Sequence, residues 1–371
     1  MHVTVQRAHL PLRSPLRTAR GTLRWRKVFV LRLEVDGCVG LGEAAPLSAA
    51  GTEGSAVTEA ALQTAVGLLQ DGVLPLSPAG AWEEPLLGAL GGAPAARHAV
   101  DGALWDLAAR RSGRPLAQIL ASTSADRVRV NALVSGDDVA AAASLAAQQG
   151  FSVLKLKVGA RPLEEDVARV AALRASAPDA LLRLDANGAW ASPQAALTAL
   201  QRIGLERVDA IEQPVSPHDR VGLAWLRRRV DVCVAADEAV LDEATGLRLL
   251  EAEAADALVL KPMKLGGMGP CLRLAEAAQA RGVRVWLTTT IDGAVARVAA
   301  LHLAAAIDPP GQEAHGVATG SLLASDVAST PEPIDGFLTV GSAPGLGLDP
   351  EALRWPQAPP AGAPAAEASP E

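Results

Sequence analysis

The sequence predicts an α/β protein in which an N-terminal α+β capping domain is followed by a parallel (β/α) barrel of the TIM type. Strand patterns cluster at the start of the chain, and from residue 127 seven short apolar runs alternate with helical patterns. Charged residues end several of these runs. A length of 371 residues suits one large domain and one smaller one.

The predicted boundaries place the capping domain at 1–122 and the barrel at 123–330, with a segment at 331–356 that returns to the capping domain. The final stretch, 357–371, reads QAPPAGAPAAEASPE. It is rich in proline and alanine, so we expect it to be disordered.

The capping domain is predicted to begin with an antiparallel sheet. HVTVQRAHL alternates apolar and polar residues as a strand does, and 27–35 forms a second strand. Asp36-Gly37 is a hairpin turn signal that leads into a third strand at 39–43. Apolar residues at helical spacing then predict helices over 55–69 and 95–111, the second ending at Ser112-Gly113.

The barrel prediction depends on the alternation of strands and helices. The apolar runs are VRVNALV, SVLKLKV, LLRLDA, VDAIEQP, VCVAAD, DALVLKP and VRVWLTT, and an eighth strand is expected near Glu313–Val317. A doubly wound open sheet is the alternative, but no Gly-x-Gly-x-x-Gly follows the first run. The expected helices are Asp138–Gln149, Leu163–Ala175, Pro193–Ile203, Asp219–Arg228, Glu243–Ala252, Pro270–Arg281 and Gly293–Ile307.

Composition argues against several classes of protein. The net charge is −7 and the chain has no run of Lys and Arg, so we expect no nucleic-acid partner. No stretch of about 18 uncharged apolar residues predicts a membrane span. The three cysteines are far apart, and the N-terminus lacks the apolar segment of a signal peptide. The expected location is therefore the cytoplasm.

Three carboxylates end successive apolar runs. Asp185, Glu212 and Asp237 are 27 and 25 residues apart, which is about one strand–helix unit each time. The carboxyl ends of barrel strands meet at one rim, where three carboxylates would repel one another without a cation. Oxygen ligands favour Mg²⁺, with Mn²⁺ as a second option. Each residue could instead be a helix cap or half of a rim ion pair.

Three lysines also occupy strand positions that suit catalysis. Lys155 and Lys157 are two residues apart, so they share one face of a strand, and we expect that face to line the barrel interior. A lysine beside another cation loses its proton more readily and can then act as a base. Lys261 ends the sixth run. The alternatives are outward-facing strand lysines and, for Lys261, a rim ion pair with Asp237 or Glu238.

These motifs resemble the enolase superfamily, in its muconate-lactonizing subgroup. The matching segments are KLKVG, LDANGAW, IEQPV, AADEAV and VLKPMKLGG, with GLGEAAPL and AVDGALWDLAARRSGRPLAQIL in the capping region. The resemblance implies metal ligation by Asp185, Glu212 and Asp237. It also implies an acid/base lysine on each face of the substrate, Lys157 and Lys261.

The same resemblance gives the supporting residues their expected roles. Lys155 assists Lys157 and contacts the substrate carboxylate, and the metal stabilises the enediolate that forms when the α-proton leaves. Asn187 and Glu238 are expected to support the site or contact substrate. Arg26, together with Arg24, is a candidate for binding a second carboxylate, unless these arginines face solvent. Members of this group often form dimers or octamers, so a homo-oligomer is an open alternative to a monomer.

The substrate class is predicted from two further stretches. GEAAPL, and TTTIDGAVARVAALHLAAAI followed by AHGVATGSLLASD, look like o-succinylbenzoate synthases. These lyases dehydrate 2-succinyl-6-hydroxy-2,4-cyclohexadiene-1-carboxylate in menaquinone biosynthesis. Dipeptide epimerases of the subgroup carry an Asp-x-Asp pair near the eighth strand, where this chain has HGVATG. A dipeptide epimerase, an N-acylamino acid racemase, a muconate-type cycloisomerase and a non-catalytic barrel remain as alternatives.

Overall fold

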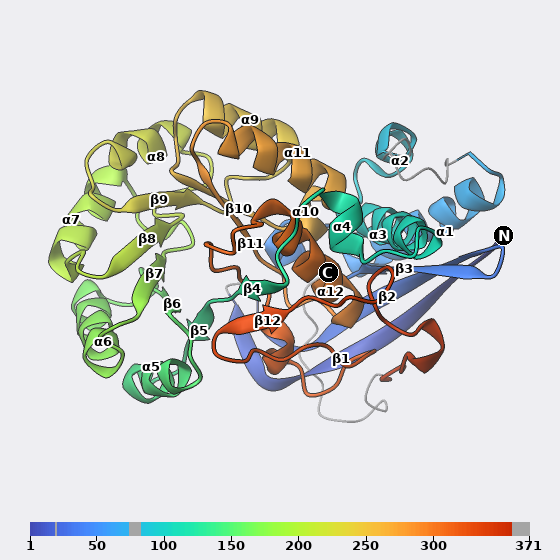
Figure 1. The fold of residues 1–371 in the computed structure, drawn as a ribbon. Coiled ribbons are helices and arrows are strands. Elements are labelled where there is room, and N and C mark those ends of the chain that lie inside the picture. Colours follow the sequence, from blue (N-terminus) through green and yellow to red (C-terminus); the bar gives the residue numbers. More distant parts are fainter. Residues whose placement is uncertain (19–20, 74–82, 358–371) are drawn as a thin grey trace.

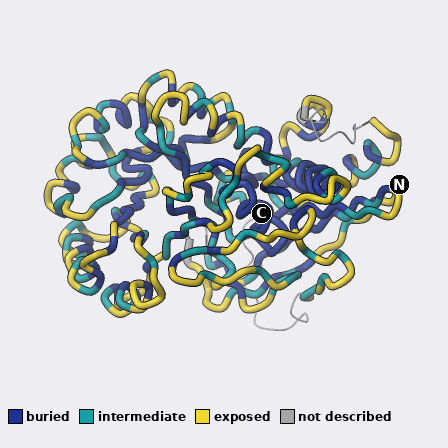
Figure 2. Tube along the Cα trace, viewed as in Figure 1, coloured by how far each residue is buried: buried dark blue, intermediate teal, exposed yellow. Residues whose placement is uncertain are grey.

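The computed structural model describes residues 1–18, 21–73 and 83–357. The chain forms a capping domain and a curled parallel sheet with helices on its outer side (Figure 1). Buried residues concentrate in the sheet strands and in the layer between the capping sheet and its helices (Figure 2). The predicted fold class is confirmed. The tail predicted to be disordered lies, apart from Gln357, outside the described residues.

The capping sheet is antiparallel in the order β1-β2-β3, as predicted. Its strands are longer than the sequence pattern indicated: β1 spans His2–Thr18, β2 spans Gly21–Val35 and β3 spans Cys38–Ala44. The turn between β2 and β3 has positive φ at Asp36 and Gly37, which a tight hairpin turn requires. The covering helices are α1 (Ser55–Gln70), α2 (Glu83–Leu90), α3 (Pro94–Arg111) and α4 (Leu116–Leu120).

Helix α3 packs directly on the backbone of β3. A Cβ atom on Gly42 would lie 1.7 Å from the Ala99 carbonyl oxygen, so only glycine allows this approach. The carboxylate of Asp106, fully buried in α3, accepts a hydrogen bond from the Leu41 amide at 2.9 Å. Asp106 also accepts one from the Leu346 amide at 2.7 Å, which joins the C-terminal segment to the capping domain.

Gly42→Ala is expected to lower the free energy of unfolding by about 3 kcal/mol or more, because the helix must move off the sheet. Gly67→Ala is the matched control, since a Cβ on Gly67, inside α1, meets nothing within 4 Å. That change should stabilise the protein by about 0.5–1 kcal/mol. Urea unfolding followed by circular dichroism measures both values. Equal stability of Gly42→Ala and wild type would contradict the packing argument.

The parallel sheet has the strand order β11-β10-β9-β8-β7-β6-β5. Its ends are joined by the segment around His315 and Gly316, near the predicted eighth strand. The Asn131 amide donates to the His315 carbonyl at 3.1 Å, and the Gly316 amide donates to the Leu287 carbonyl at 2.7 Å. The strands are β5 (Ala132–Val134), β6 (Val153–Lys157), β7 (Leu181–Asp185), β8 (Val208–Glu212), β9 (Cys233–Ala236), β10 (Ala257–Leu260) and β11 (Arg284–Leu287).

One predicted run is divided between two sheets. In VRVNALV, only β5 belongs to the barrel, whereas β4 (Arg127–Arg129) pairs antiparallel with β12 (Phe337–Thr339) of the C-terminal segment. Short 3-10 turns occur at Ser48–Ala50, Thr319–Leu322 and Pro350–Ala352. The barrel helices are α5 (Val139–Gln148), α6 (Leu163–Ser176), α7 (Pro193–Ile203), α8 (Arg220–Arg227), α9 (Glu243–Glu251), α10 (Pro262–Leu265), α11 (Met268–Gln279) and α12 (Ala294–Ile307).

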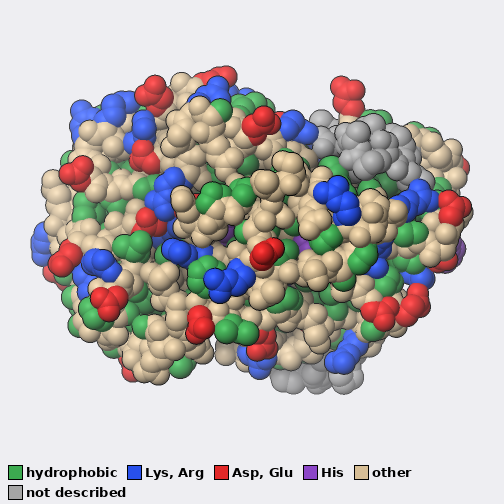
Figure 3. Space-filling view, in the orientation of Figure 1, with side chains coloured by type: hydrophobic (Ala, Val, Ile, Leu, Met, Phe, Trp, Pro, Cys, Tyr) green, Lys and Arg blue, Asp and Glu red, His purple; other side chains and the backbone are tan. Residues whose placement is uncertain are grey.

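Lys and Arg side chains are interspersed with Asp and Glu over the face of the molecule shown in Figure 3. Among the helices in the described part of the chain, none combines the length and apolar character needed to cross a membrane.

Candidate active site

Strand register brings the predicted charged residues to one rim of the barrel. Lys157 at the end of β6 pairs with Asp185 at the end of β7, and Asp185 pairs with Glu212 at the end of β8. Asp237 directly follows β9, and Lys261 directly follows β10. Because neighbouring strand ends carry these groups, the side chains cluster where barrel enzymes have their active sites.

Lys155 lies between two of the carboxylates. Its ammonium nitrogen is 2.7 and 2.8 Å from the two Glu212 oxygens and 3.0 Å from Asp185 Oδ2. Burial lowers the pKa of Lys155, but Glu212, Asp185 and Asp237 raise it more strongly, so the net pKa shift is upward. Lys155 is therefore a charged group that neutralises the carboxylates.

Lys261 forms the second ion pair of the rim. Its ammonium is 2.6 Å from Asp237 Oδ1 and 2.7 Å from Oδ2. Burial raises the pKa of Asp237, but Lys261 and Lys155 outweigh it and hold that pKa at about 2. The rim ion pair considered as an alternative for Lys261 is thus present, and it places the lysine against a predicted metal ligand.

Lys157 belongs to a hydrogen-bonded chain across the rim. Its ammonium donates to Asn187 Oδ1 at 2.6 Å, and Asn187 Nδ2 donates to Glu238 Oε1 at 2.9 Å. Lys264 Nζ donates to the Glu238 carbonyl at 3.2 Å. Asn187 and Glu238, predicted as supporting residues, therefore connect the two sides of the barrel mouth.

Two residues of the rim were missed from sequence. Lys264 lies in the short helix α10 and is only 6% exposed. Its signal is the three-residue spacing from Lys261, which places both on one side of a helical turn. Gln213 accepts hydrogen bonds from the Asp237 and Ala239 amides at 3.1 and 3.0 Å. It follows Glu212 directly, which is its only sequence signal.

Arg26 lies inside the protein, so the solvent-facing alternative is wrong for it, while Arg24 is exposed. The guanidinium donates to the carbonyls of Ala45, Pro46 and Ile291 at 2.7, 2.8 and 3.0 Å. Each of its three nitrogens donates to a backbone carbonyl, so Arg26 supports these loops, and its role toward a second carboxylate stays a prediction.

Glu43, from the GEAAPL motif, links the capping domain to the barrel. This fully buried carboxylate accepts hydrogen bonds from the amides of Gly293 and Val295 at 2.6 and 3.1 Å, at the start of α12. The positive end of the helix dipole favours an anion there. The pKa of Glu43 is nevertheless raised to about 8, mainly by burial and further by the negative charges of Asp326 and Asp292.

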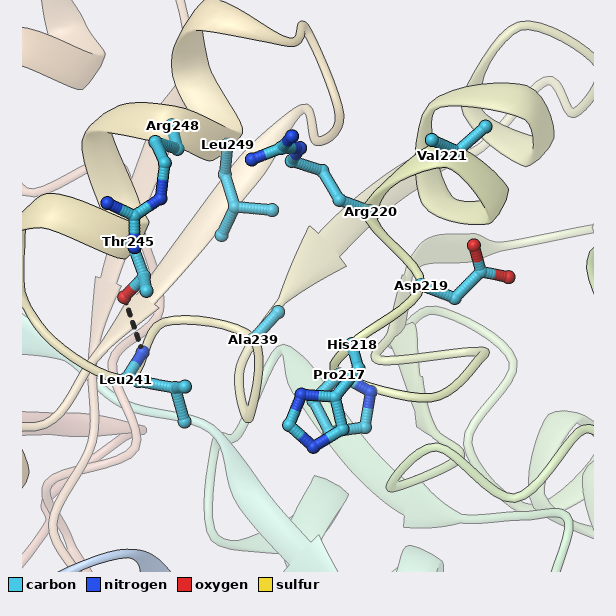
Figure 4. Close-up of a pocket in the computed structure, with 10 residues that line it drawn as sticks. All are labelled: Pro217, His218, Asp219, Arg220, Val221, Ala239, Leu241, Thr245, Arg248 and Leu249. Carbon is cyan, nitrogen blue, oxygen red and sulfur yellow. Dashed lines mark hydrogen bonds between the residues drawn. The ribbon is translucent and has the colours of Figure 1, made fainter.

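A hollow of about 310 Å³ lies beside the rim, between the loops after β8 and β9 (Figure 4). Its lining includes His218, Arg220 and Arg248 but none of the predicted catalytic lysines or carboxylates. Ala239, one residue after Glu238, is its nearest connection along the chain to the charged cluster. We therefore assign the candidate active site to the charged rim and not to this hollow.

The donor set of the rim suits a hard cation. Asp185, Glu212 and Asp237 are 2–3% exposed and supply only carboxylate oxygens. Among the residues that the structure describes, no group of three or more Asp, Glu, His or Cys side chains is arranged so that it could hold a metal ion. The ammonium group of Lys155 lies between two of the carboxylates instead. These carboxylates thus already bind a positive charge at the predicted position.

Comparison with known proteins defines the class. A family described as "Enolase C-terminal domain-like" matches residues 137–353, and the mandelate racemase / muconate lactonizing enzyme N-terminal domain matches residues 1–121. The chain belongs to the enolase superfamily. It is similar to a crystallised dipeptide epimerase from Enterococcus faecalis, complexed with Mg and the dipeptide L-Leu-L-Tyr (TM-score 0.83, 28% identity, covering 93% of this chain and 98% of that one).

Relatives in the superfamily have several activities. The chain is 32% identical to the L-Ala-D/L-Glu epimerase of Bacillus subtilis, over 82% of this chain and 84% of the relative. It is 31% identical to a muconate cycloisomerase of Acinetobacter lwoffii, over 91% and 90%. It is 39% identical to the o-succinylbenzoate synthase of Thermobifida fusca, over 58% and 67%. Superfamily membership therefore leaves the reaction open.

Proposed function

We propose that this protein is a Mg²⁺-dependent o-succinylbenzoate synthase that dehydrates 2-succinyl-6-hydroxy-2,4-cyclohexadiene-1-carboxylate. The observation that carries the proposal is the placement of Lys157 and Lys261 at the ends of β6 and β10, with three carboxylates on the strand ends between them. We also propose a cytoplasmic enzyme of menaquinone biosynthesis, with a small carboxylate as its substrate.

Asp185, Glu212 and Asp237 would hold the metal ion. Mg²⁺, when bound, supplies positive charge beside the substrate carboxylate, which makes the α-proton more acidic. Lys155 would turn from Glu212 and Asp185 toward the substrate carboxylate, keeping its charge. Asn187 would keep Lys157 directed across the rim, since it accepts the hydrogen bond of that ammonium.

Lys157 would act as base and then as acid. In its neutral form it takes the α-proton, and the electron pair of the broken C–H bond passes to the carboxylate as an enediolate. The pair then returns to form the ring double bond while the C–O bond to the hydroxyl breaks. Lys157 gives its proton to the leaving hydroxide, which departs as water. Lys261, on the opposite face, would stabilise the anion by its charge.

The segment near the eighth strand supports the synthase over a dipeptide epimerase. Residues 314–324 contain no Asp or Glu that could pair with a substrate ammonium group. His315 is buried and accepts a hydrogen bond from the Leu287 amide at 3.0 Å, and the Thr289 and Thr319 hydroxyls are hydrogen-bonded to each other at 2.7 Å. The polar side chains of 314–324 are thus one histidine, one threonine and one serine, with no carboxylate among them.

A dipeptide epimerase or N-acylamino acid racemase is the second candidate. The Bacillus subtilis and Enterococcus faecalis relatives cover more of the chain than the synthases do, which favours this reading. Here both lysines would transfer protons, one on each face. A muconate-type cycloisomerase is the third candidate, supported by the Acinetobacter lwoffii relative.

Turnover of the cyclohexadiene substrate tests the proposal. With Mg²⁺, loss of diene absorbance should proceed with kcat/KM of about 10⁴ M⁻¹s⁻¹ or more, and EDTA should stop it until excess Mg²⁺ is restored. Circular dichroism before and after chelation controls for unfolding. Absence of turnover by a folded, Mg²⁺-loaded protein would reject the synthase. Dipeptides and N-acylamino acids in D₂O would then test the second candidate.

A further inference from the structure

We propose that Arg26 is a positioning residue that holds Ile291 in a left-handed backbone conformation and so fixes the loop 288–293 beside Lys261. Arg26 comes from the capping strand β2, whereas Ile291 lies in the barrel loop between β11 and α12. One side chain thus sets the position of a barrel loop relative to the capping domain.

Ile291 is strained where it stands. Its φ is +61°, a conformation in which a β-branched side chain is a clear outlier. Such strain persists only where the surroundings impose it. The Arg26 Nε hydrogen bond to the Ile291 carbonyl, at 3.0 Å, is the contact that acts on this peptide directly.

The ends of the loop are also fixed. The Thr288 amide donates to the Leu260 carbonyl at 3.0 Å, one residue before Lys261. The Gly293 amide donates to Glu43 at 2.6 Å. Between these ends, Asp292 Oδ1 accepts the Thr290 hydroxyl at 2.5 Å. Arg297 Nη1 donates to the Asp292 carbonyl at 3.0 Å, and Arg26 holds the Ile291 carbonyl just before it.

The same guanidinium holds a capping segment against the barrel. It donates to the Ala45 and Pro46 carbonyls, and the Ala45 amide lies 3.3 Å from Met263 Sδ in α10, the helix that follows Lys261. Arg26 is 2% exposed, so water does not compete for its hydrogen bonds. Losing Arg26 would therefore free two walls of the mouth on the Lys261 side.

The test combines two substitutions. Arg26→Met removes the donors but keeps the bulk, and Ile291→Gly lets the loop adopt positive φ without a Cβ penalty. Arg26→Met should lower kcat/KM by about 10²-fold, the scale of a small misplacement of catalytic groups. Ile291→Gly alone should leave activity near wild type. In the double variant, Ile291→Gly should raise kcat/KM roughly 5- to 30-fold above that of Arg26→Met. This factor corresponds to the cost of about 1–2 kcal/mol that a side chain adds to the left-handed conformation.

Asp335→Gly is the matched control, because Asp335 is an exposed left-handed residue in the C-terminal segment. It should not restore activity to Arg26→Met. Equal losses in Arg26→Met and Arg26→Met/Ile291→Gly would overturn the proposal. If Arg26→Met does not fold, Arg26→Lys takes its place in the same comparison.

The activity readout rests on the proposed function, so a second readout is independent of it. Hydrogen exchange of the peptide containing 288–293 should be faster in Arg26→Met than in wild type. Unchanged exchange in Arg26→Met would overturn the positioning role. Wild-type protein that turns over none of the candidate substrates would reject the proposed function alone.

Discussion

Asp237→Asn is expected to lower kcat/KM by at least about 10³-fold while the protein stays folded. The loss of one fixed charge-stabilising donor costs about 10²–10³ in kcat, and Asp237 would both bind the cation and partner Lys261. The residue lies at the end of β9 on the rim, outside the packed apolar core. Steady-state kinetics measure the loss of kcat/KM, and calorimetric titration with Mg²⁺ measures the loss of cation binding.

Asp138→Asn is the control for that change. Asp138 caps α5 by accepting a hydrogen bond from the Ala141 amide at 2.9 Å, and asparagine caps helices equally well. Activity and melting temperature should therefore match wild type. Full activity of Asp237→Asn would remove the residue from the proposed metal site, and loss of its circular dichroism signal would show that its carboxylate is needed for folding.

The strand ends that carry the rim could be predicted because barrel strands follow a local rule. Each apolar run predicts one strand, and the parallel strands of a barrel bring their C-terminal residues to the same rim. Spacing therefore predicts that Asp185 and Glu212 lie together, and the alternation of strand faces directs Lys157 to the same interior. The strand register pairs Lys157 with Asp185 and Asp185 with Glu212. The local pattern contains the information that this part of the structure needs.

Residues whose partners are remote in sequence could not be placed in this way. Arg26 hydrogen-bonds to Ile291, 265 residues later, and no periodicity connects the two. The division of VRVNALV between β4 and β5 has a similar cause, since β4 pairs with β12 from the C-terminal segment. A strand pattern predicts a strand but does not specify which sheet it joins. Lys264 was missed because α10 is a single turn, too short to show helical periodicity.

Lys261→Arg is expected to separate the two leading reactions. Arginine keeps the positive charge beside Asp237, but its guanidinium does not give up a proton at any ordinary pH. A dehydratase that uses Lys261 only for its charge should keep activity within about 10²-fold of wild type, whereas Lys261→Ala should lose about 10³-fold or more. An epimerase or racemase needs proton transfer on that face, so Lys261→Arg should inactivate it.

Lys157→Arg is the matched comparison, because both reactions need a proton to be taken at that position. Lys157→Arg should show no activity in either assay. It should neither dehydrate the cyclohexadiene substrate, followed by diene absorbance, nor catalyse deuterium uptake from D₂O by dipeptides or N-acylamino acids. Dehydration by Lys157→Arg at the wild-type rate would contradict the assignment of Lys157 as the base. Epimerisation by Lys261→Arg would contradict proton transfer by Lys261. The two arginine variants therefore assign a proton-transfer or charge role to each lysine, whichever substrate the enzyme accepts.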